Sequence, residues 1–196
     1  PEQDVAPHLS TKVALDLARL DDCLGQVERS LADSLSRLRR KRVDLLFLHT
    51  QIGTETADGK VGIGDVLAKG GVADALDAVR ERGLVDAIGI TALGDTPAVC
   101  EALASGRFDA AQVYYNLLNP SAGRVMPAAW SGQNLGGIID ACKDNDVGVM
   151  NIRTLAAGVI ATDTRTGREV PLTPDFELAE EERKAHAAFD ALGLEY

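Results

Sequence analysis

Short apolar runs alternate along the chain with segments in which apolar residues return every three or four positions. Residues 43–49 read Val-Asp-Leu-Leu-Phe-Leu-His, a run typical of a strand that is buried on both faces. Runs of the same kind occur at residues 9–13, 84–91, 110–115 and 147–153. This alternation of strand and helix, five times over, predicts an α/β fold whose parallel sheet has right-handed crossovers.

The segments with helical period predict helices that have recognisable ends. We expect helices over residues 27–38, 72–79, 96–106, 136–146 and 178–192. A basic cluster at residues 37–42 suits the negative end of the first helix, and Gly83 stops the second. Thr96 is expected to cap the third helix, because Pro97 follows it and proline favours the first helical position.

Two long connections, residues 50–71 and 116–133, each follow a strand and therefore lie at the carboxyl ends of the strands. Barrel enzymes build their sites on that face. The competing architecture is a doubly wound open sheet. A Rossmann sheet of this kind would need a Gly-x-Gly-x-x-Gly turn after a strand, and the glycines of residues 59–71 lack that spacing. The pattern favours a parallel (β/α)8 TIM-type barrel, in which residues 161–174 read as an excursion or short hairpin.

The chain is short for a complete barrel of this kind, which takes about 250 residues. About five of the eight strands are visible in its 196 residues, and a five-stranded arc would leave two sheet edges unpaired. We expect residues 1–196 to form a single (β/α) barrel domain that lacks the N-terminal strands and the C-terminal strand. The sequence is accordingly expected to be a piece of a longer protein.

The composition is that of an ordinary globular domain, with 45% hydrophobic and 26% charged residues. A net charge of -10 and a pI near 4.7 argue against binding of nucleic acid or of an anionic membrane through bulk charge. No run is long enough to span a membrane, and the first residues lack the order of a signal peptide, so we expect a cytoplasmic protein. Cys23, Cys100 and Cys142 are expected to be free thiols.

The candidate chemistry begins at His49, which stands at the carboxyl end of the run 43–49. Taken alone, such a histidine is either a hydrogen-bonded structural residue or a group that acts on a ligand. The strand at 9–13 carries Lys12, and if the two strands are neighbours in a barrel, Lys12 and His49 face one pocket. No metal site is expected, because His8, His49 and His186 are not accompanied by clustered ligands at strand ends.

Several short motifs occur in a fixed order along the chain. They are Leu-Ser-Thr-Lys-Val from Leu9, Ser-Leu-x-x-Ser-Leu-x-Arg-Leu from Ser30, Val-Asp-Leu-Leu-x-Leu-His from Val43, Gly-Leu-Val with Ile-Gly-Ile-Thr from Gly83 to Thr91, and Gln-Val-Tyr-Tyr-Asn with Leu-Asn-Pro from Gln112 to Pro120. Each motif is weak by itself, and together they cover nearly the whole chain up to Gly158. In these motifs the chain resembles the aldo-keto reductase family, in particular its bacterial branch that oxidises aldehydes or aldoses.

The resemblance implies a (β/α)8 barrel that binds a nicotinamide cofactor, NADP or NAD, in extended form without a Rossmann domain. The family uses an aspartate and a tyrosine from the second strand and its loop, a lysine on the third strand and a histidine on the fourth. Lys12 and His49 match the lysine and the histidine as catalytic residues. The tyrosine and the aspartate are expected before Pro1, since Tyr114 and Tyr115 belong to a later strand and read as core or pocket-wall residues.

The resemblance also implies where the cofactor would be held. Gln112 matches the glutamine of the sixth strand that binds the nicotinamide carboxamide, and Thr91 stands for the serine hydroxyl after the fifth strand. Ala92 takes the place of an asparagine found in many members, so one amide contact is missing. Arg153 falls where many members stack an aromatic ring on the nicotinamide. It either reaches a phosphate or the substrate, or it forms a salt bridge at the mouth of the barrel.

Two functions stay open on this evidence. The first is an NAD(P)-dependent oxidoreductase that interconverts an aldehyde, a ketone or an aldose with its reduced or oxidised form. The second is a catalytically weak relative that binds the nicotinamide cofactor as a sensor or subunit, because barrels are reused freely. The partner expected is a small carbonyl or sugar molecule, with no nucleic acid and no membrane, and homo-oligomerisation stays open.

Overall fold

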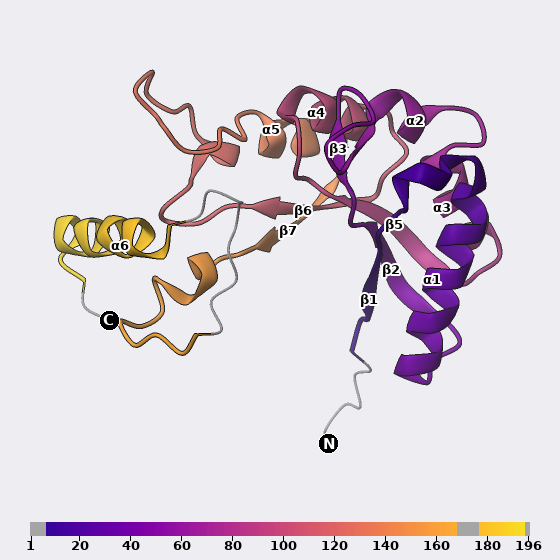
Figure 1. Cartoon of the computed structure of the whole chain (residues 1–196), viewed down its shortest axis with the longest axis horizontal. Coiled ribbons are helices and arrows are strands. Elements are labelled where there is room, and N and C mark those ends of the chain that lie inside the picture. The colour runs from indigo at the N-terminus through magenta and orange to yellow at the C-terminus, as the bar shows by residue number, and fades with distance from the viewer. Residues whose placement is uncertain (1–6, 168–176, 195–196) are drawn as a thin grey trace. The chain divides into compact units, whose positions relative to one another are not determined.

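The computed structural model describes residues 7–167 and 177–194 of the chain. In these residues five strands form the main sheet, in the order β1-β2-β5-β6-β7 (Figure 1). They are β1 (Ser10–Val13), β2 (Val43–Leu48), β5 (Val85–Thr91), β6 (Ala110–Tyr114) and β7 (Gly148–Ile152). The ladders that join β1 to β2, β2 to β5 and β5 to β6 are all parallel, which confirms the predicted α/β architecture.

Helices occupy the segments between the strands, as the periodicity predicts. They are α1 (Cys23–Leu38), which follows the 3-10 turn η1 (Leu17–Asp22), α2 (Ile63–Leu67), α3 (Val72–Glu81), α4 (Thr96–Ala104), α5 (Ile138–Asp144) and α6 (Leu178–Leu192). The expected cap of α4 is wrong by one residue, because the helix begins at Thr96 and Asp95 is its N-cap. None of the helices in the described residues is long and apolar enough to cross a membrane.

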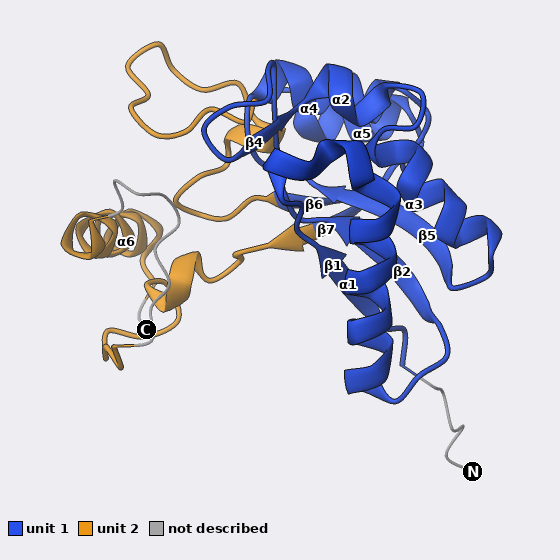
Figure 2. Ribbon diagram, turned by 45° about the vertical axis from the view of Figure 1, so that its right-hand side comes forward, with its two compact units in different colours: residues 1–113, 137–150 blue, residues 114–136, 151–196 orange. Residues whose placement is uncertain are grey.

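The chain divides into two compact units (Figure 2). Unit 1 comprises Pro1–Val113 and Gly137–Met150, and it contains helices α1 to α5 and most of the main sheet. Unit 2 comprises Tyr114–Gly136 and Asn151–Tyr196, and it contains the 3-10 turns η2 (Ser121–Gly123) and η3 (Ala156–Gly158) and helix α6. The chain passes from unit 1 to unit 2 at the carboxyl ends of β6 and β7.

In unit 1 alternate residues of the strands face the helices. Thr11 in β1 donates through Oγ1 to Ser34 Oγ in α1 over 3.0 Å, which identifies the face of the sheet that α1 covers. Leu46 pairs with Thr11 and Ile88 pairs with Leu46, so both share this face, and both are fully buried. Each side chain buried in this way stabilises the fold by roughly 1.5–3 kcal/mol. The helix layer is therefore held on the sheet by every second strand residue.

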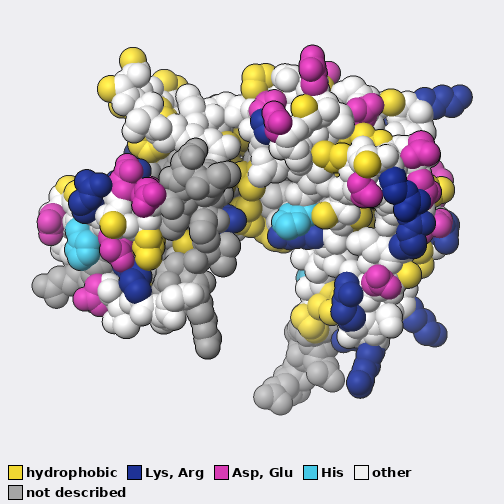
Figure 3. Space-filling view, in the orientation of Figure 1, with side chains coloured by type: hydrophobic (Ala, Val, Ile, Leu, Met, Phe, Trp, Pro, Cys, Tyr) yellow, Lys and Arg dark blue, Asp and Glu magenta, His cyan; other side chains and the backbone are white. Residues whose placement is uncertain are grey.

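The basic cluster at the end of α1 is a solvent-exposed helix terminus. Figure 3 shows Lys and Arg side chains gathered around the lower end of α1. The helix stops at Arg39, whose φ of 53° is left-handed and whose N–H donates to Ser36 and Leu35 carbonyls. Arg42 then forms an ion pair with Asp86 of β5, beside the first residues of β2.

The structure differs from the sequence analysis in the connection at residues 50–71, which was expected to be a loop. It contains two three-residue strands, β3 (Gln51–Gly53) and β4 (Lys60–Gly62), and helix α2. β3 pairs in parallel with β4, and Ile52 of β3 also forms a β-bridge with Gly94. Elements this short have no readable period, and a bridge to a residue distant in sequence exists only in the folded chain.

Unit 2 has a small core of its own. Ala156, Val159 and Ala185 are fully buried, and Leu118, Ile160 and Leu178 pack against them. Arg165 forms an ion pair with Glu182 of α6, with Nε and Oε1 2.5 Å apart. Arg165 belongs to the excursion expected at residues 161–174, of which residues 168–174 lie outside the described residues.

We predict that Gly89→Ala destabilises the protein by about 1–3 kcal/mol, the usual cost of overpacking a core. A Cβ atom at Gly89 would lie 2.4 Å from the Ala110 carbonyl oxygen and 2.7 Å from the Phe47 ring, so the β2, β5 and β6 strands would have to move. Urea unfolding measures the change. Gly64→Ala is the matched control, because a Cβ there meets no atom within 4 Å, and it should leave the free energy of unfolding unchanged or raised. Equal stabilities of the two variants would contradict the prediction.

Candidate active site

Lys12 and His49 lie on neighbouring strands. β1 pairs with β2 so that Lys12 stands opposite Phe47 and Val13 stands opposite Leu48. His49 follows β2 directly, and its backbone N–H donates to the Val13 carbonyl over 2.7 Å. The strands are therefore adjacent, as the sequence analysis supposes, and both residues stand near the carboxyl ends of their strands.

One face of the sheet carries four of the five predicted site residues. Because Thr11 faces α1, Lys12 points to the opposite face of β1. The residues in register with Lys12 on the next strands are Phe47, Gly89 and Ala110, and two positions further along are His49, Thr91 and Gln112. Since the pleat repeats every two residues, these last three share the face of Lys12.

Lys12 and His49 have exposed side chains with no partner in the described part of the chain. Neither forms a side-chain hydrogen bond or an ion pair with a residue in the ranges 7–167 and 177–194. Because both side chains are exposed, a bound molecule could reach them.

The pKa of His49 lies below its ordinary value near 6.5. Partial burial is the larger cause, and the positive charge of Lys12 lowers the pKa further. The imidazole is therefore neutral at pH 7 and can donate a hydrogen bond through one ring nitrogen. The unfolded chain binds this proton more readily, so the stability that His49 contributes is present above about pH 6.5 and declines as the pH falls below it.

Thr91 and Gln112 form a buried polar pair on the same face. The Thr91 hydroxyl lies 3.4 Å from Gln112 Oε1, and Gln112 Nε2 donates to the Met150 sulfur over 3.5 Å. Thr91 and Gln112 are only 2% and 4% exposed. Ala92 is fully buried, and its backbone N–H donates to the Gln112 carbonyl over 2.9 Å.

Arg153 lies in unit 2, whereas the other four predicted site residues lie in unit 1. It follows β7 with a left-handed φ of 56°, and its carbonyl accepts a hydrogen bond from Asn116 Nδ2 over 2.9 Å. Within the described ranges no carboxylate forms an ion pair with its guanidinium. The described residues therefore supply no carboxylate for the salt bridge that was the alternative role of Arg153.

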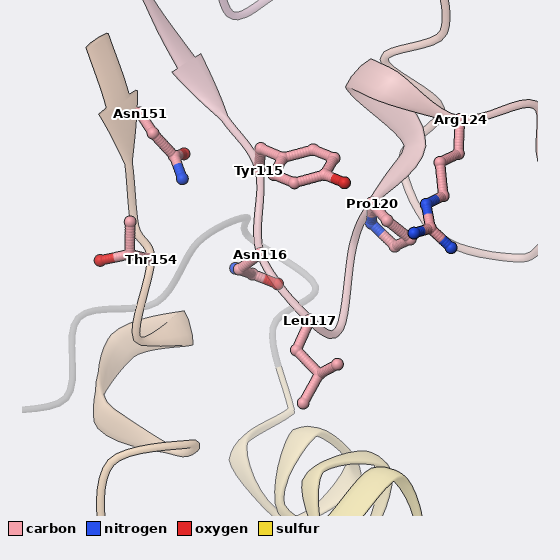
Figure 4. A pocket seen from close by; sticks show the side chains of 7 residues that line it. All are labelled: Tyr115, Asn116, Leu117, Pro120, Arg124, Asn151 and Thr154. Carbon is pink, nitrogen blue, oxygen red and sulfur yellow. The ribbon is translucent and has the colours of Figure 1, made fainter. Parts of the chain in front are cut away.

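Unit 2 contains a pocket that the sequence analysis did not single out. It has a volume of about 410 Å³ and lies at the carboxyl ends of β6 and β7 (Figure 4). It is lined by Tyr115, Asn116, Leu117, Pro120, Arg124, Asn151 and Thr154. Tyr114 is buried and Tyr115 lines this pocket, in agreement with their interpretation as core or wall residues. The long connection after β6 indicated that a site could lie in this region. No motif or pattern in the sequence pointed to Asn151 or Thr154 as pocket residues.

The sequence and the fold both match known proteins. The family model described as Aldo/keto reductase family matches residues 8–194. The fold is similar to that of an aldo/keto reductase from Klebsiella pneumoniae, crystallised with NADP and acetate, at 19% sequence identity and a TM-score of 0.55. Aldo-keto reductases from Bacillus halodurans, in its holo form, and from the silkworm Bombyx mori match at 16% and 21% identity with TM-scores of 0.56 and 0.53.

These matches cover 79%, 90% and 81% of this chain, but only 45%, 51% and 43% of the three known chains. The chain thus spans about half the length of these structures. The likeness confirms the expected barrel-type α/β fold, of which the described sheet forms five strands. A search of the curated proteins found no match.

We predict that His49 titrates below pH 6.5 and that Lys12→Met raises its pKa. The increase should stop short of the ordinary value, because the burial of the imidazole remains after the charge of Lys12 is removed. An NMR titration of the imidazole protons measures both values. Lys41→Met removes the same charge from an exposed site at the amino end of β2 and should leave the pKa of His49 unchanged. The same pKa in Lys12→Met and wild type would show that the two side chains are not coupled.

Proposed function

Because the chain belongs to the aldo/keto reductase family, we propose that it is part of an NAD(P)-dependent oxidoreductase that interconverts an aldehyde, a ketone or an aldose with its reduced or oxidised form. The observation that carries the proposal is the shared sheet face of Lys12, His49, Thr91 and Gln112 near the carboxyl ends of their strands. Barrel enzymes hold their reacting groups at that end.

The roles of Lys12 and His49 follow from the proton chemistry of carbonyl reduction. The substrate oxygen gains negative charge in the reaction, so a general acid must stand within hydrogen-bond reach of it. A phenol with its ordinary pKa near 10 is a weak acid for this purpose, and a neighbouring ammonium lowers that pKa. We assign this effect to Lys12 and the orientation of the substrate oxygen to the neutral imidazole of His49.

The phenol is proposed to come from a tyrosine outside strands β1 and β2. The tyrosines of this sequence are Tyr114, Tyr115 and Tyr196. Burial raises the pKa of Tyr114, which is the opposite of what a general acid needs. The second candidate is a protein that binds the nicotinamide cofactor with little turnover, which would apply if no other tyrosine completes the site.

The buried pair of Thr91 and Gln112 fits a carboxamide group. Gln112 Nε2 donates to a thioether, which is a weak acceptor, so this amide can turn its N–H to a carboxamide oxygen at little cost. Gln112 Oε1 and the Thr91 hydroxyl can accept from the carboxamide nitrogen. When bound, a nicotinamide cofactor supplies the hydride. We assign Arg153 to a phosphate of the cofactor or to an anionic substrate group.

We expect the protein encoded by the full reading frame to reduce a simple aldehyde with NADPH or NADH. Residues 1–196 by themselves should show no measurable reduction, because loss of a general acid costs roughly 10²- to 10⁴-fold. The fall in absorbance of the reduced cofactor measures the rate. Turnover by residues 1–196 would place the acid within them, and cofactor binding without turnover by the full protein would favour the sensor.

In the active protein Lys12→Met should lower kcat and move the alkaline limb of the pH–rate profile to higher pH. The reason is that the pKa of the proposed phenol rises once the ammonium is gone. Lys41→Met is the control and should leave the profile in place. An alkaline limb at the same pH in Lys12→Met would remove the proposed role of this lysine.

We predict that Gln112→Ala weakens NADPH binding by about 2- to 10-fold, which corresponds to the loss of one neutral hydrogen bond. The kcat at saturating cofactor should change less, since the amide contacts the carboxamide and not the reacting carbon. Isothermal titration gives the dissociation constant. Gln133→Ala removes an exposed amide from unit 2 and should leave it unchanged. A wild-type dissociation constant in Gln112→Ala would exclude this residue from the cofactor site.

A further inference from the structure

His49 and Thr91 lie between two points at which their chain segments are joined. The ladder between β2 and β5 ends at the pair Leu48 and Ile90, so His49 and Thr91 are the next residue on each side. A parallel β-bridge joins the two segments again a few residues further along. The backbone at both candidate site residues is therefore set by a ladder on one side and by this bridge on the other.

The bridge is built from close backbone contacts. Ile52 N–H donates to the Leu93 carbonyl over 3.1 Å, and Asp95 N–H donates to the Ile52 carbonyl over 2.8 Å. Gly94 has a φ of 122°, and a Cβ atom there would lie 2.0 Å from the Ile52 oxygen. Only glycine allows the segment after Thr91 to approach the segment after His49 so closely.

The carboxylate of Asp95 joins the same two segments through two further contacts. Its Oδ1 lies 2.5 Å from Lys60 Nζ, and its Oδ2 accepts from the Thr54 backbone N–H over 3.1 Å. The Lys60 and Asp95 side chains are 32% and 34% exposed, so the pair is partly shielded from water. The contact with Lys60, followed by that with Thr54, holds the pKa of Asp95 below its usual range, and the carboxylate is charged at neutral pH.

We propose that Lys60 and Asp95 form a positioning pair, which holds the segment that begins with His49 against the segment that begins with Thr91. The proposal rests on the proposed function, in which His49 orients the substrate oxygen and Thr91 holds the cofactor carboxamide. The distance between the two segments then sets the distance between hydride donor and acceptor. Breaking the pair should affect the chemical step more than the binding of either molecule.

The test compares Lys60→Met, Asp95→Asn and Lys60→Arg in the full protein. Lys60→Met and Asp95→Asn should each lower kcat at saturating NADPH by at least about tenfold, since a shift of about 1 Å can cost about 10²-fold. The cofactor dissociation constant should change less than about threefold. Lys60→Arg keeps the charge and should recover most of kcat, and the double variant should be no worse than either single variant. Asp95→Asn keeps an oxygen that can accept from the Thr54 N–H. This variant should therefore remain folded and test the proposal even if Lys60→Met does not fold.

The ion pair of Arg42 and Asp86 provides a control, because it joins the residue before β2 to β5 at the amino ends of these strands, away from His49 and Thr91. Arg42→Met should lower the stability about as much as Lys60→Met and leave kcat unchanged. An unchanged kcat in both Lys60→Met and Asp95→Asn, or an equal loss in Arg42→Met, would overturn the positioning role.

An NMR measurement separates this proposal from the proposed function. A wild-type protein without turnover would contradict the proposed function but would leave the geometric claim to be decided by chemical shifts. The ring resonances of His49 and the amide resonance of Thr91 should shift in Lys60→Met and stay in place in Arg42→Met. Unshifted resonances in Lys60→Met would overturn the proposal whatever the activity.

Discussion

The register of the parallel ladder is the constraint on which both the fold and the candidate site depend. Residues that face the helices alternate with residues that face the other side of the sheet. A slip of one residue would turn Lys12 and Gln112 toward the helices and would move Leu46 and Ile88, which now share the helix-covered face, to the opposite face. The burial that holds the helices on the sheet therefore also sets which face carries the candidate chemistry.

A network of ion pairs joins helix α3 to the main sheet. On the helix side of unit 1, Arg107 contacts Asp74 and Asp77, and Arg80 contacts Asp77 and Asp109. Asp109 also accepts from the Ile88 backbone N–H, so this network ties α3 to the β5 strand and to the start of β6. Lys12, on the opposite sheet face, forms no ion pair with a carboxylate in the described residues.

The sequence predicted the elements whose pattern is local. The strand at residues 43–49 and the helix at 178–192 were both identified, because a buried run and a helical period are readable without knowledge of the fold. The connection at residues 50–71 was not, since β3 and β4 are three residues long and depend on contacts with Gly94 and with each other. The cap of α4 was misplaced by one residue for a related reason: the carboxylate of Asp95 is engaged by Lys60 and Thr54, which only the folded chain brings near.

By itself the sequence determined the class of fold, the order of the strands in the chain and the residue types at the strand ends, because these follow from periodicity and motif. It named Lys12, His49, Thr91 and Gln112, but it could not show that they share a face, since that depends on the register between strands. The tertiary structure decided this register, and it decided that His49 and Thr91 are enclosed between a ladder and a bridge. The physical reason is that side-chain direction is a local property of the backbone, whereas the partner across a ladder is chosen by burial over the whole sheet.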